Sequence, residues 1–219
     1  MVWNIPIALT TFRLLAAPGV AVIFLYFNRP WADWFALVLF VSVALTDWFD
    51  GYLARLWGQT TKFGAMLDPI ADKAMVVIAL AVILGYSSMS PWLVLPATVI
   101  MFRELFVSGV REFLGENSSA LKTTFLAKFK TTLQMVAISA LFAQGVFEHY
   151  IGLAIQNLDP GKVSAILAGE AEDMHGLLWK MNAMGVMENC GIYLLWAAAA
   201  LTLVTGLDYF IKSLPFFRE

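Results

Sequence analysis

The chain has 219 residues, of which 60% are hydrophobic and 14% are charged, and its mean hydropathy is +0.76. Soluble domains carry about 25% charged residues, so this composition excludes an ordinary soluble protein. The formal net charge of −2 gives no reason to expect nucleic acid as a partner. With two histidines and a single cysteine, Cys190, the chain can form neither an internal disulfide nor a Cys/His zinc cluster.

Apolar segments along the chain predict an all-α, polytopic integral membrane protein with six transmembrane helices. Each segment has roughly the 20 residues that a helix needs to cross a bilayer. The first one lacks the positive n-region and small-residue cleavage site of a signal peptide, so we expect it to be retained as a span. The expected spans are residues 5–28, 31–57, 65–86, 92–114, 127–148 and 191–212.

The first expected span contains one charge, Arg13. An arginine at this depth either snorkels to the membrane surface or faces a polar site. The residues alone leave both interpretations open.

Four aspartates lie toward the adjoining ends of the second and third spans, although one charge inside a bilayer costs roughly 2.5 to 3.5 kcal/mol on insertion scales. Asp47 and Asp50 are three residues apart, and Asp68 and Asp72 are four apart. Each pair therefore shares one face of a helix. If the turn at 58–64 joins the two helices, all four carboxylates can point at one another, and they then need a counter-charge.

A divalent-metal site that holds a diphosphate meets this need. Carboxylate oxygens suit Mg²⁺ or Mn²⁺, with waters and substrate phosphates completing the coordination. Gly51 and Ala54 leave room for a ligand beside the backbone, and Arg55 offers a permanent cation to a phosphate. The alternative is a set of structural salt bridges. Only Arg55 is well placed for these, because Lys62 lies in the turn and Lys73 points elsewhere on its helix.

The fourth and fifth spans contain a second group of ionisable residues. Intramembrane ionisable residues indicate function by default, although Glu104 could pair with Arg103 or Arg111 for structure alone. Lysines at the start of the fifth span serve either as membrane-surface anchors or as a phosphate clamp. The candidate clamp consists of Arg103, Arg111, Lys128 and Lys130.

Residues 149–190 do not fit the pattern of a span. We expect an atypical insertion on the non-cytoplasmic side, containing a short amphipathic segment on the membrane surface. Its polar group is interpreted as a solvated face rather than a second metal site: Glu170, Glu172, Asp173 and His175.

Basic residues predict the orientation. The loops after the second and fourth spans and the C-terminal tail hold most of them, whereas the opposite loops hold only Arg29, Lys162 and Lys180. The positive-inside rule therefore places both termini and the aspartates on the cytoplasmic side.

The run Asp47-x2-Asp50-Gly51-x2-Ala54-Arg55-x8-Gly64-x3-Asp68-x3-Asp72 resembles the complete signature of the CDP-alcohol phosphotransferase family. Every fixed position is filled, in order and at the family's spacing. Supporting stretches occur around Asn4 to Arg13, Arg103-Glu104, Arg111-Glu112 and Lys128 to Met135. The resemblance covers residues 1 to about 148 and the last helix, but not 149–190.

The resemblance implies an enzyme that transfers a phosphatidyl group from a CDP-activated lipid to an alcohol and releases CMP. It implies two bound Mg²⁺ or Mn²⁺ ions, held by Asp47, Asp50, Asp68 and Asp72. Asp72 is also the implied catalytic base. The residues implied to accept the cytidine diphosphate part of the lipid are Asp47, Gly51, Ala54, Arg55 and Gly64.

The acceptor alcohol is inferred from the basic residues and the wider resemblance. Glycerol 3-phosphate carries a dianionic phosphate that a cluster of cations would bind, and an inositol phosphate would fit equally. Resemblance over 1–13 and 128–135 favours glycerol 3-phosphate, with CDP-diacylglycerol as donor. Serine or phosphatidylglycerol as acceptor, or a divalent-cation transporter, are the alternatives. The family also implies a homodimer in the bacterial inner (cytoplasmic) membrane.

Overall fold

The computed structural model describes residues 5–57, 62–115 and 125–217. Within these ranges only the backbone is described for 5–7, 44, 46–57, 62, 63, 65, 125, 127 and 128. Every regular element in the described part of the chain is a helix, as predicted. Its helices are α1 (Ile5–Tyr26), α2 (Trp31–Trp57), α3 (Lys62–Tyr86), α4 (Pro91–Leu114), α5 (Phe125–Gln156), α6 (Pro160–Ala168), α7 (Leu177–Ser213) and the short 3₁₀ helix η2 (Leu214–Phe217).

Local sequence explains several helix ends. Pro91 begins α4 and Pro160 begins α6, because a proline at the first helical position removes a backbone N–H that would have no partner there. The Asp159 carboxylate caps α6 by accepting a hydrogen bond of 3.2 Å from the Gly161 amide. Gly169 ends the same helix with a φ of 76°, in the left-handed region that glycine adopts readily.

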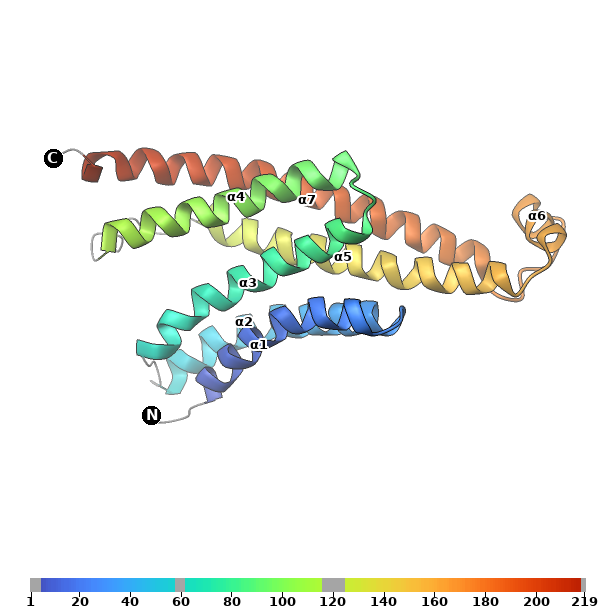
Figure 1. The fold of residues 1–219 in the computed structure, drawn as a ribbon, viewed down its shortest axis with the longest axis horizontal. Coiled ribbons are helices and arrows are strands. Elements are labelled where there is room, and N and C mark those ends of the chain that lie inside the picture. The colour runs from blue at the N-terminus through green and yellow to red at the C-terminus, as the bar shows by residue number, and fades with distance from the viewer. Residues whose placement is uncertain (1–4, 58–61, 116–124, 218–219) are drawn as a thin grey trace.

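Two layers of long helices form the bundle, with α5 lying along α7 and α1 along α3 (Figure 1). Small residues allow close approach: Ala17, Ala36 and Ala137 are fully buried. A chain of rings fills the centre, with Phe142 lying 5.8 Å from Phe24 and 5.6 Å from Phe40 between ring centroids. The start of α1 and the end of α7 lie at the same end of the bundle (Figure 1).

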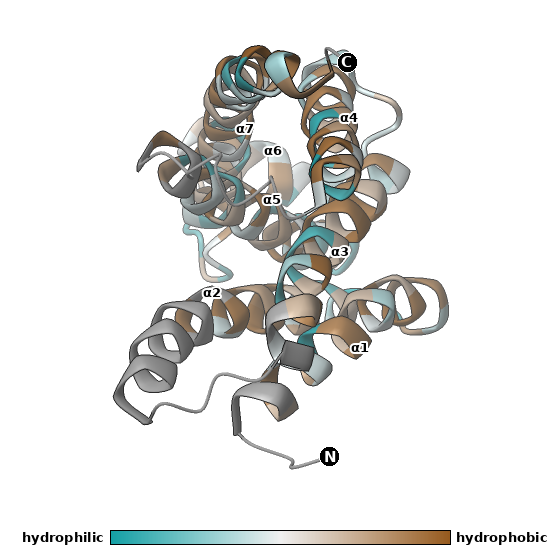
Figure 2. Ribbon diagram, turned by 90° about the vertical axis from the view of Figure 1, so that its left-hand side faces the viewer, coloured by the Kyte–Doolittle hydropathy of each residue, from teal (hydrophilic) through white to brown (hydrophobic). Residues whose placement is uncertain are grey.

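Large apolar side chains cover the outside of these helices, as a lipid environment requires. Leu25 is 75% exposed and Tyr193 is 72% exposed. Hydrophobic residues dominate the ribbon in Figure 2, and hydrophilic stretches interrupt it on α3 and α4. Among the described residues, four stretches are long and apolar enough to cross a membrane: Ala8–Tyr26, Pro91–Leu114, Phe129–Gln156 and Leu177–Phe217. The count of six spans stays a prediction.

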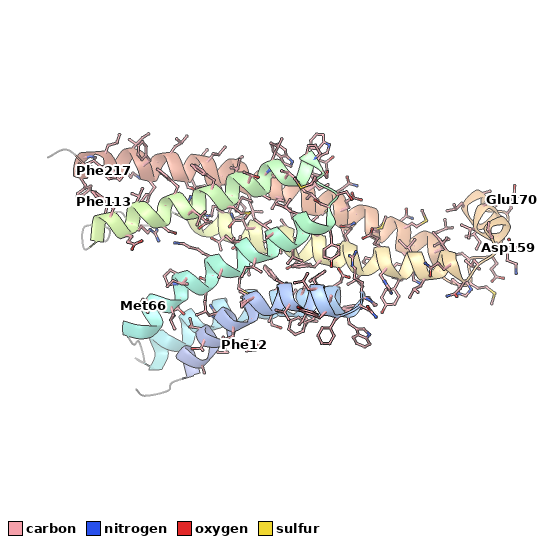
Figure 3. The ribbon with its side chains drawn as sticks, in the orientation of Figure 1. Phe12, Met66, Phe113, Asp159, Glu170 and Phe217 are labelled. Atoms are coloured by element: carbon pink, nitrogen blue, oxygen red, sulfur yellow. The ribbon has the colours of Figure 1, made fainter. Side chains whose placement is uncertain are left out.

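The expected insertion at 149–190 differs from the prediction in its form. α5 continues to Gln156 and α7 already begins at Leu177. The helices that contain the predicted fifth and sixth spans therefore extend further at this end than those spans do. Only α6 and its flanking turns lie between them. Ile151, Ile166 and Leu177 form a small separate core that joins the three helices. We call residues 149–190 the distal hairpin; Asp159 and Glu170 mark its tip, at the end opposite to the chain termini (Figure 3).

Helix α7 begins with a carboxylate cap inside this hairpin. The Asp173 side chain accepts hydrogen bonds from the Leu177 amide at 2.7 Å and the Leu178 amide at 2.9 Å. These backbone donors lower the pKa of Asp173 below its ordinary value. Among the described residues no group of three His, Cys, Asp or Glu side chains is placed to hold a metal ion.

Candidate active site

Helix α1 holds both aspartates of α3. The Thr10 hydroxyl donates a hydrogen bond to Asp68 Oδ1, and Arg13 Nη1 lies 3.4 Å from Asp72 Oδ1. Thr10 and Arg13 are three residues apart on α1, and the two acids are four apart on α3. Both pairs therefore form along one line of contact between the helices.

Arg13 faces this polar site rather than snorkelling to the surface. Its side chain is 3% exposed, whereas that of Asp72 is 44% exposed. The arginine thus orients a carboxylate that stays open to a ligand. The sequence analysis considered only Arg55 well placed as a counter-cation, and this was wrong, because Arg13 reaches Asp72 from 59 residues away in the chain.

A cavity of about 320 Å³ opens beside Asp72, between α2, α3 and α5. Among the described residues of its wall Asp72 is the only charged one, and the hydroxyl groups come from α5. The remaining wall is apolar. The lining residues are Val41, Val43, Leu45, Asp72, Met75, Val76, Thr131, Thr132, Met135, Val136 and Ser139. The site therefore combines one partly exposed carboxylate with a hydrocarbon-lined space.

A basic cluster lies on the other side of α3. Lys130 of α5 donates a hydrogen bond to the Glu104 carboxylate of α4, and Arg103 Nη1 lies 3.3 Å from the same oxygen, Glu104 Oε1. Arg103 Nη2 also donates to Thr205 Oγ1 of α7 at 3.4 Å. Glu104 is 8% exposed and Lys130 3% exposed. Three helices thus meet around one buried carboxylate.

Helix α3 connects the two halves of the site. Lys73 directly follows Asp72, so a rotation of about 100° along the helix points it away from that acid, as expected. Its ammonium group donates to Ser108 Oγ of α4. Ser108 in turn donates to the Glu104 carbonyl oxygen at 2.6 Å. Asp72 therefore faces α1 and the cavity, while its neighbour joins the basic cluster.

The two arginines of α4 lie against α7 in different ways. The Arg111 guanidinium carbon lies 5.4 Å from the centroid of the Tyr209 ring, a cation–π contact. Arg103 runs over Gly206, where an added Cβ would lie 3.0 Å from Arg103 Cγ. Glycine at this position thus makes room for the arginine side chain. Residues of α7 were missed by the sequence analysis, since nothing along the chain relates them to α4.

The described side chains include only part of the predicted site. The backbone of α2 is helical through Trp57, so the helical spacing of its motif residues holds. Gly64 lies inside the first turns of α3, which begins three residues earlier than expected. The predicted residues whose side chains lie outside the described part are Asp47, Asp50, Gly51, Ala54, Arg55 and Lys128.

Two of the four predicted metal ligands can be examined directly. Asp68 is exposed and Asp72 is partly exposed, one helical turn apart on the same helix. Their oxygens are hard donors of the kind that Mg²⁺ and Mn²⁺ prefer, and both carboxylates are accessible, so the chemistry of the donor set fits such an ion. The contribution of Asp47 and Asp50 stays a prediction.

Comparison with known proteins agrees with this arrangement. A family model described as CDP-alcohol phosphatidyltransferase matches residues 3–159. The chain belongs to this family. The match includes the whole acidic motif and the cations of α4 and α5, and it ends where α6 begins. The expected family resemblance is therefore confirmed.

Individual relatives extend the likeness beyond that match. A protein of Cereibacter sphaeroides, named CDP-diacylglycerol–glycerol-3-phosphate 3-phosphatidyltransferase, is 59% identical over 225 residues, covering 100% of this chain and 99% of the relative. Proteins with the same name from Salmonella choleraesuis and Shigella flexneri are each 40% identical over 158 residues, covering 71% of this chain and 86% of the relatives.

Proposed function

We propose that the protein is a phosphatidylglycerophosphate synthase. It transfers the phosphatidyl group of CDP-diacylglycerol to sn-glycerol 3-phosphate and releases CMP, a step of phospholipid biosynthesis. The observation that carries this proposal is the 59% identity, over the full chain, to a relative named for this activity. The site geometry supports it independently, because an acidic half and a basic half lie on the two sides of α3.

The acidic half suits the nucleotide-activated lipid. Asp47, Gly51, Ala54, Arg55 and Gly64 accept the cytidine diphosphate part. The cavity beside Asp72 supports this assignment, since its apolar wall is compatible with the hydrocarbon part of a lipid. Divalent ions held by Asp47, Asp50, Asp68 and Asp72 would neutralise the diphosphate and stabilise the leaving group.

The reaction then requires an acceptor hydroxyl close to Asp72. Asp72 accepts the proton of this hydroxyl while the hydroxyl oxygen forms a bond to the lipid phosphorus. The bond between that phosphorus and the CMP oxygen then breaks, and CMP leaves. Arg13 holds the Asp72 carboxylate in place. Because this carboxylate is partly exposed, one of its oxygens stays within reach of substrate. Positioning of the two substrates provides much of the catalysis in transfers of this kind.

The basic half suits the phosphate of the acceptor. Arg103, Arg111, Lys128 and Lys130 are proposed to bind this dianion. Three of them lie in the described cluster on α4 and α5, which continues on α5 directly into the two threonines of the cavity wall. Serine or choline carries no phosphate dianion and would gain little from such a cluster.

The finer assignments are proposals as well. We infer six membrane spans, two metal ions, a homodimer, and a position in the bacterial inner membrane with the active site and both termini facing the cytoplasm. The excess of basic residues at the end of the molecule that holds the site and the termini supports this orientation.

Incubation of the purified protein with CDP-diacylglycerol, Mg²⁺ and a panel of alcohols tests the function. We expect CMP release with glycerol 3-phosphate and none with serine or phosphatidylglycerol, and loss of activity on chelation of the metal. An inositol phosphate included in the panel tests the remaining phosphate acceptor. Release of CMP with a different acceptor only, or Mg²⁺ flux through vesicles without CMP release, would overturn the proposal.

A further inference from the structure

The centre of the basic cluster is itself an acid. Glu104 is buried, and its Oε1 atom takes both the hydrogen bond from Lys130 and the 3.3 Å contact from Arg103. The Glu104 backbone carbonyl accepts from Ser108, which also binds Lys73. Through its side chain and its backbone, Glu104 therefore connects cations from α3, α4 and α5.

The charges around Glu104 do not balance. Lys73, Arg103 and Arg111 lie close enough to interact electrostatically with one another, and Lys130 is bonded to the acid directly. Against these four cations the described residues place two carboxylates, Glu104 and, through its electrostatic contact with Lys73, Asp72, which leaves a surplus of two positive charges. An ion network that served only to join helices would be close to neutral, because each uncompensated charge in a membrane is costly. The surplus indicates that the cluster is completed by an anionic ligand.

The cations retain donors for such a ligand. An ammonium group has three N–H donors and a guanidinium has five. Arg103 uses Nη1 toward Glu104 and Nη2 toward Thr205. Its Nε–H is buried and has no hydrogen-bond partner among the described residues. A buried donor in this state is uncommon in native proteins and points to a missing acceptor.

We propose that Glu104 is a positioning residue for the acceptor alcohol. Its carboxylate holds Lys130 and Arg103 at fixed places before substrate arrives, so that their remaining N–H groups can bind the phosphate dianion of the acceptor. Without Glu104 the two cations repel each other, and their side chains become ordered only when the acceptor binds. The cost of this ordering weakens the binding of the acceptor. This inference rests on the proposed function and adds a negatively charged residue to a site whose other members are basic.

Substitution of Glu104 separates this role from a merely structural one. In Glu104→Gln we expect the KM for glycerol 3-phosphate to rise about tenfold or more, since a charged hydrogen-bond partner is lost. The KM for CDP-diacylglycerol should change less than about twofold, because that lipid binds on the other side of α3, and kcat at saturating acceptor should be largely retained. Glu104→Asp should recover part of the loss.

The matched control is Glu112→Gln. Glu112 is an exposed acid on the same helix, two turns further on. Its substitution should leave the KM values for both substrates unchanged. An equal rise of both KM values in Glu104→Gln, or a loss of kcat alone, would contradict a positioning role.

A second comparison covers the case in which the single variant fails to fold. The triple variant Glu104→Gln with Arg103→Met and Lys130→Met removes the acid and both of its partners, so none of these buried charges is left without its counterpart. If Glu104 acts through these two cations, adding Glu104→Gln to the double variant Arg103→Met and Lys130→Met should raise the acceptor KM by less than about twofold, because contacting residues are not additive. A further tenfold rise would overturn the inference.

The two proposals fail in different ways. If the wild-type protein does not use glycerol 3-phosphate, the proposed function fails, whatever the variants do. If the wild-type protein uses it and Glu104→Gln leaves its KM unchanged, only the positioning role fails.

Discussion

Asp72 shows how one residue can take part in two environments. Its carboxylate contacts Arg13 on one side and lines an apolar cavity on the other. The neighbouring Lys73 belongs to a separate cluster on α4. Consecutive helical residues point about 100° apart, so α3 can present an acid to the cavity and a cation to the basic cluster from adjacent positions.

Loss of the Asp72 carboxylate should stop turnover without stopping lipid binding. We expect Asp72→Asn to reduce CMP release by at least about 100-fold, as for removal of a general base. Binding of CDP-diacylglycerol, measured by equilibrium dialysis, should change by far less, because other residues are proposed to accept its nucleotide. Asp208→Asn, an exposed acid paired with Lys212 on α7, is the control. Normal turnover in Asp72→Asn would remove Asp72 as the base.

At the scale of elements, packing at the end of the bundle away from the active site depends on the absence of one side chain. Arg29 forms a two-bond pair with Asp33, at 2.7 and 2.9 Å, and stacks over the Tyr86 ring. The hydrogen bond to Asp33 raises the pKa of Arg29 above its ordinary value. Gly145 of α5 lies against this pair, where an added Cβ would be 2.4 Å from both Arg29 Nη2 and Asp33 Oδ1. The glycine thus permits α5 to pass close to the turn between α1 and α2.

Two glycines of α5 should respond oppositely to alanine. Gly145→Ala should destabilise the protein by about 1 to 3 kcal/mol, because the Asp33 side chain is buried and cannot move aside without breaking the pair. Gly152→Ala has no atom within 4 Å of its new Cβ, and it should stabilise by up to about 1 kcal/mol through helix propensity. Thermal unfolding of both variants in the same detergent measures the difference. A Gly145→Ala protein as stable as Gly152→Ala would contradict the close packing.

At the scale of the whole molecule, the long helices fall into two classes of length. Helices α1 to α4 have 22 to 27 residues, or about 33 to 40 Å, which matches a bilayer. Helices α5 and α7 have 32 and 37 residues, or about 48 and 56 Å. From Gly145, at the level of the Arg29 pair, α5 continues for about 16 Å to Gln156. The distal hairpin therefore extends beyond the other helices, at the end away from the candidate site (Figure 1).

Chemical labelling tests the proposed orientation. Cys190 is the only cysteine of the chain, so a Cys190→Ser background allows new thiols to be placed one at a time. In cells whose outer envelope is removed and whose cytoplasmic membrane is sealed, a membrane-impermeant maleimide should modify Glu170→Cys in the distal hairpin. It should modify Lys212→Cys, near the end of α7, only after the membrane is made permeable. The reverse pattern would place the active site outside the cytoplasm.

Much of this architecture could be predicted from the residues in order. Apolar segments of the right length predicted the long helices, because a bilayer requires each span to satisfy its own backbone hydrogen bonds. The ends of the predicted spans agree with those of the observed helices within a few residues, except in the distal hairpin. There apolar and acidic residues are mixed, so the sequence did not predict the extension of α5 and α7. The aspartate motif predicted the family, since its spacing is a local property of two helices and the turn between them.

What the amino-acid sequence determined by itself was therefore the kind of protein, the acidic motif and most of the candidate cations. Only the tertiary structure decided which partners these charges have: Arg13 with Asp72, Glu104 with Lys130 and Arg103, and Lys73 with Ser108. The physical reason is that helical periodicity determines which face a residue occupies, while the rotation and offset of one helix against another depend on side-chain packing over the whole bundle. Contacts between segments 26 to 102 residues apart follow from that packing and from nothing local.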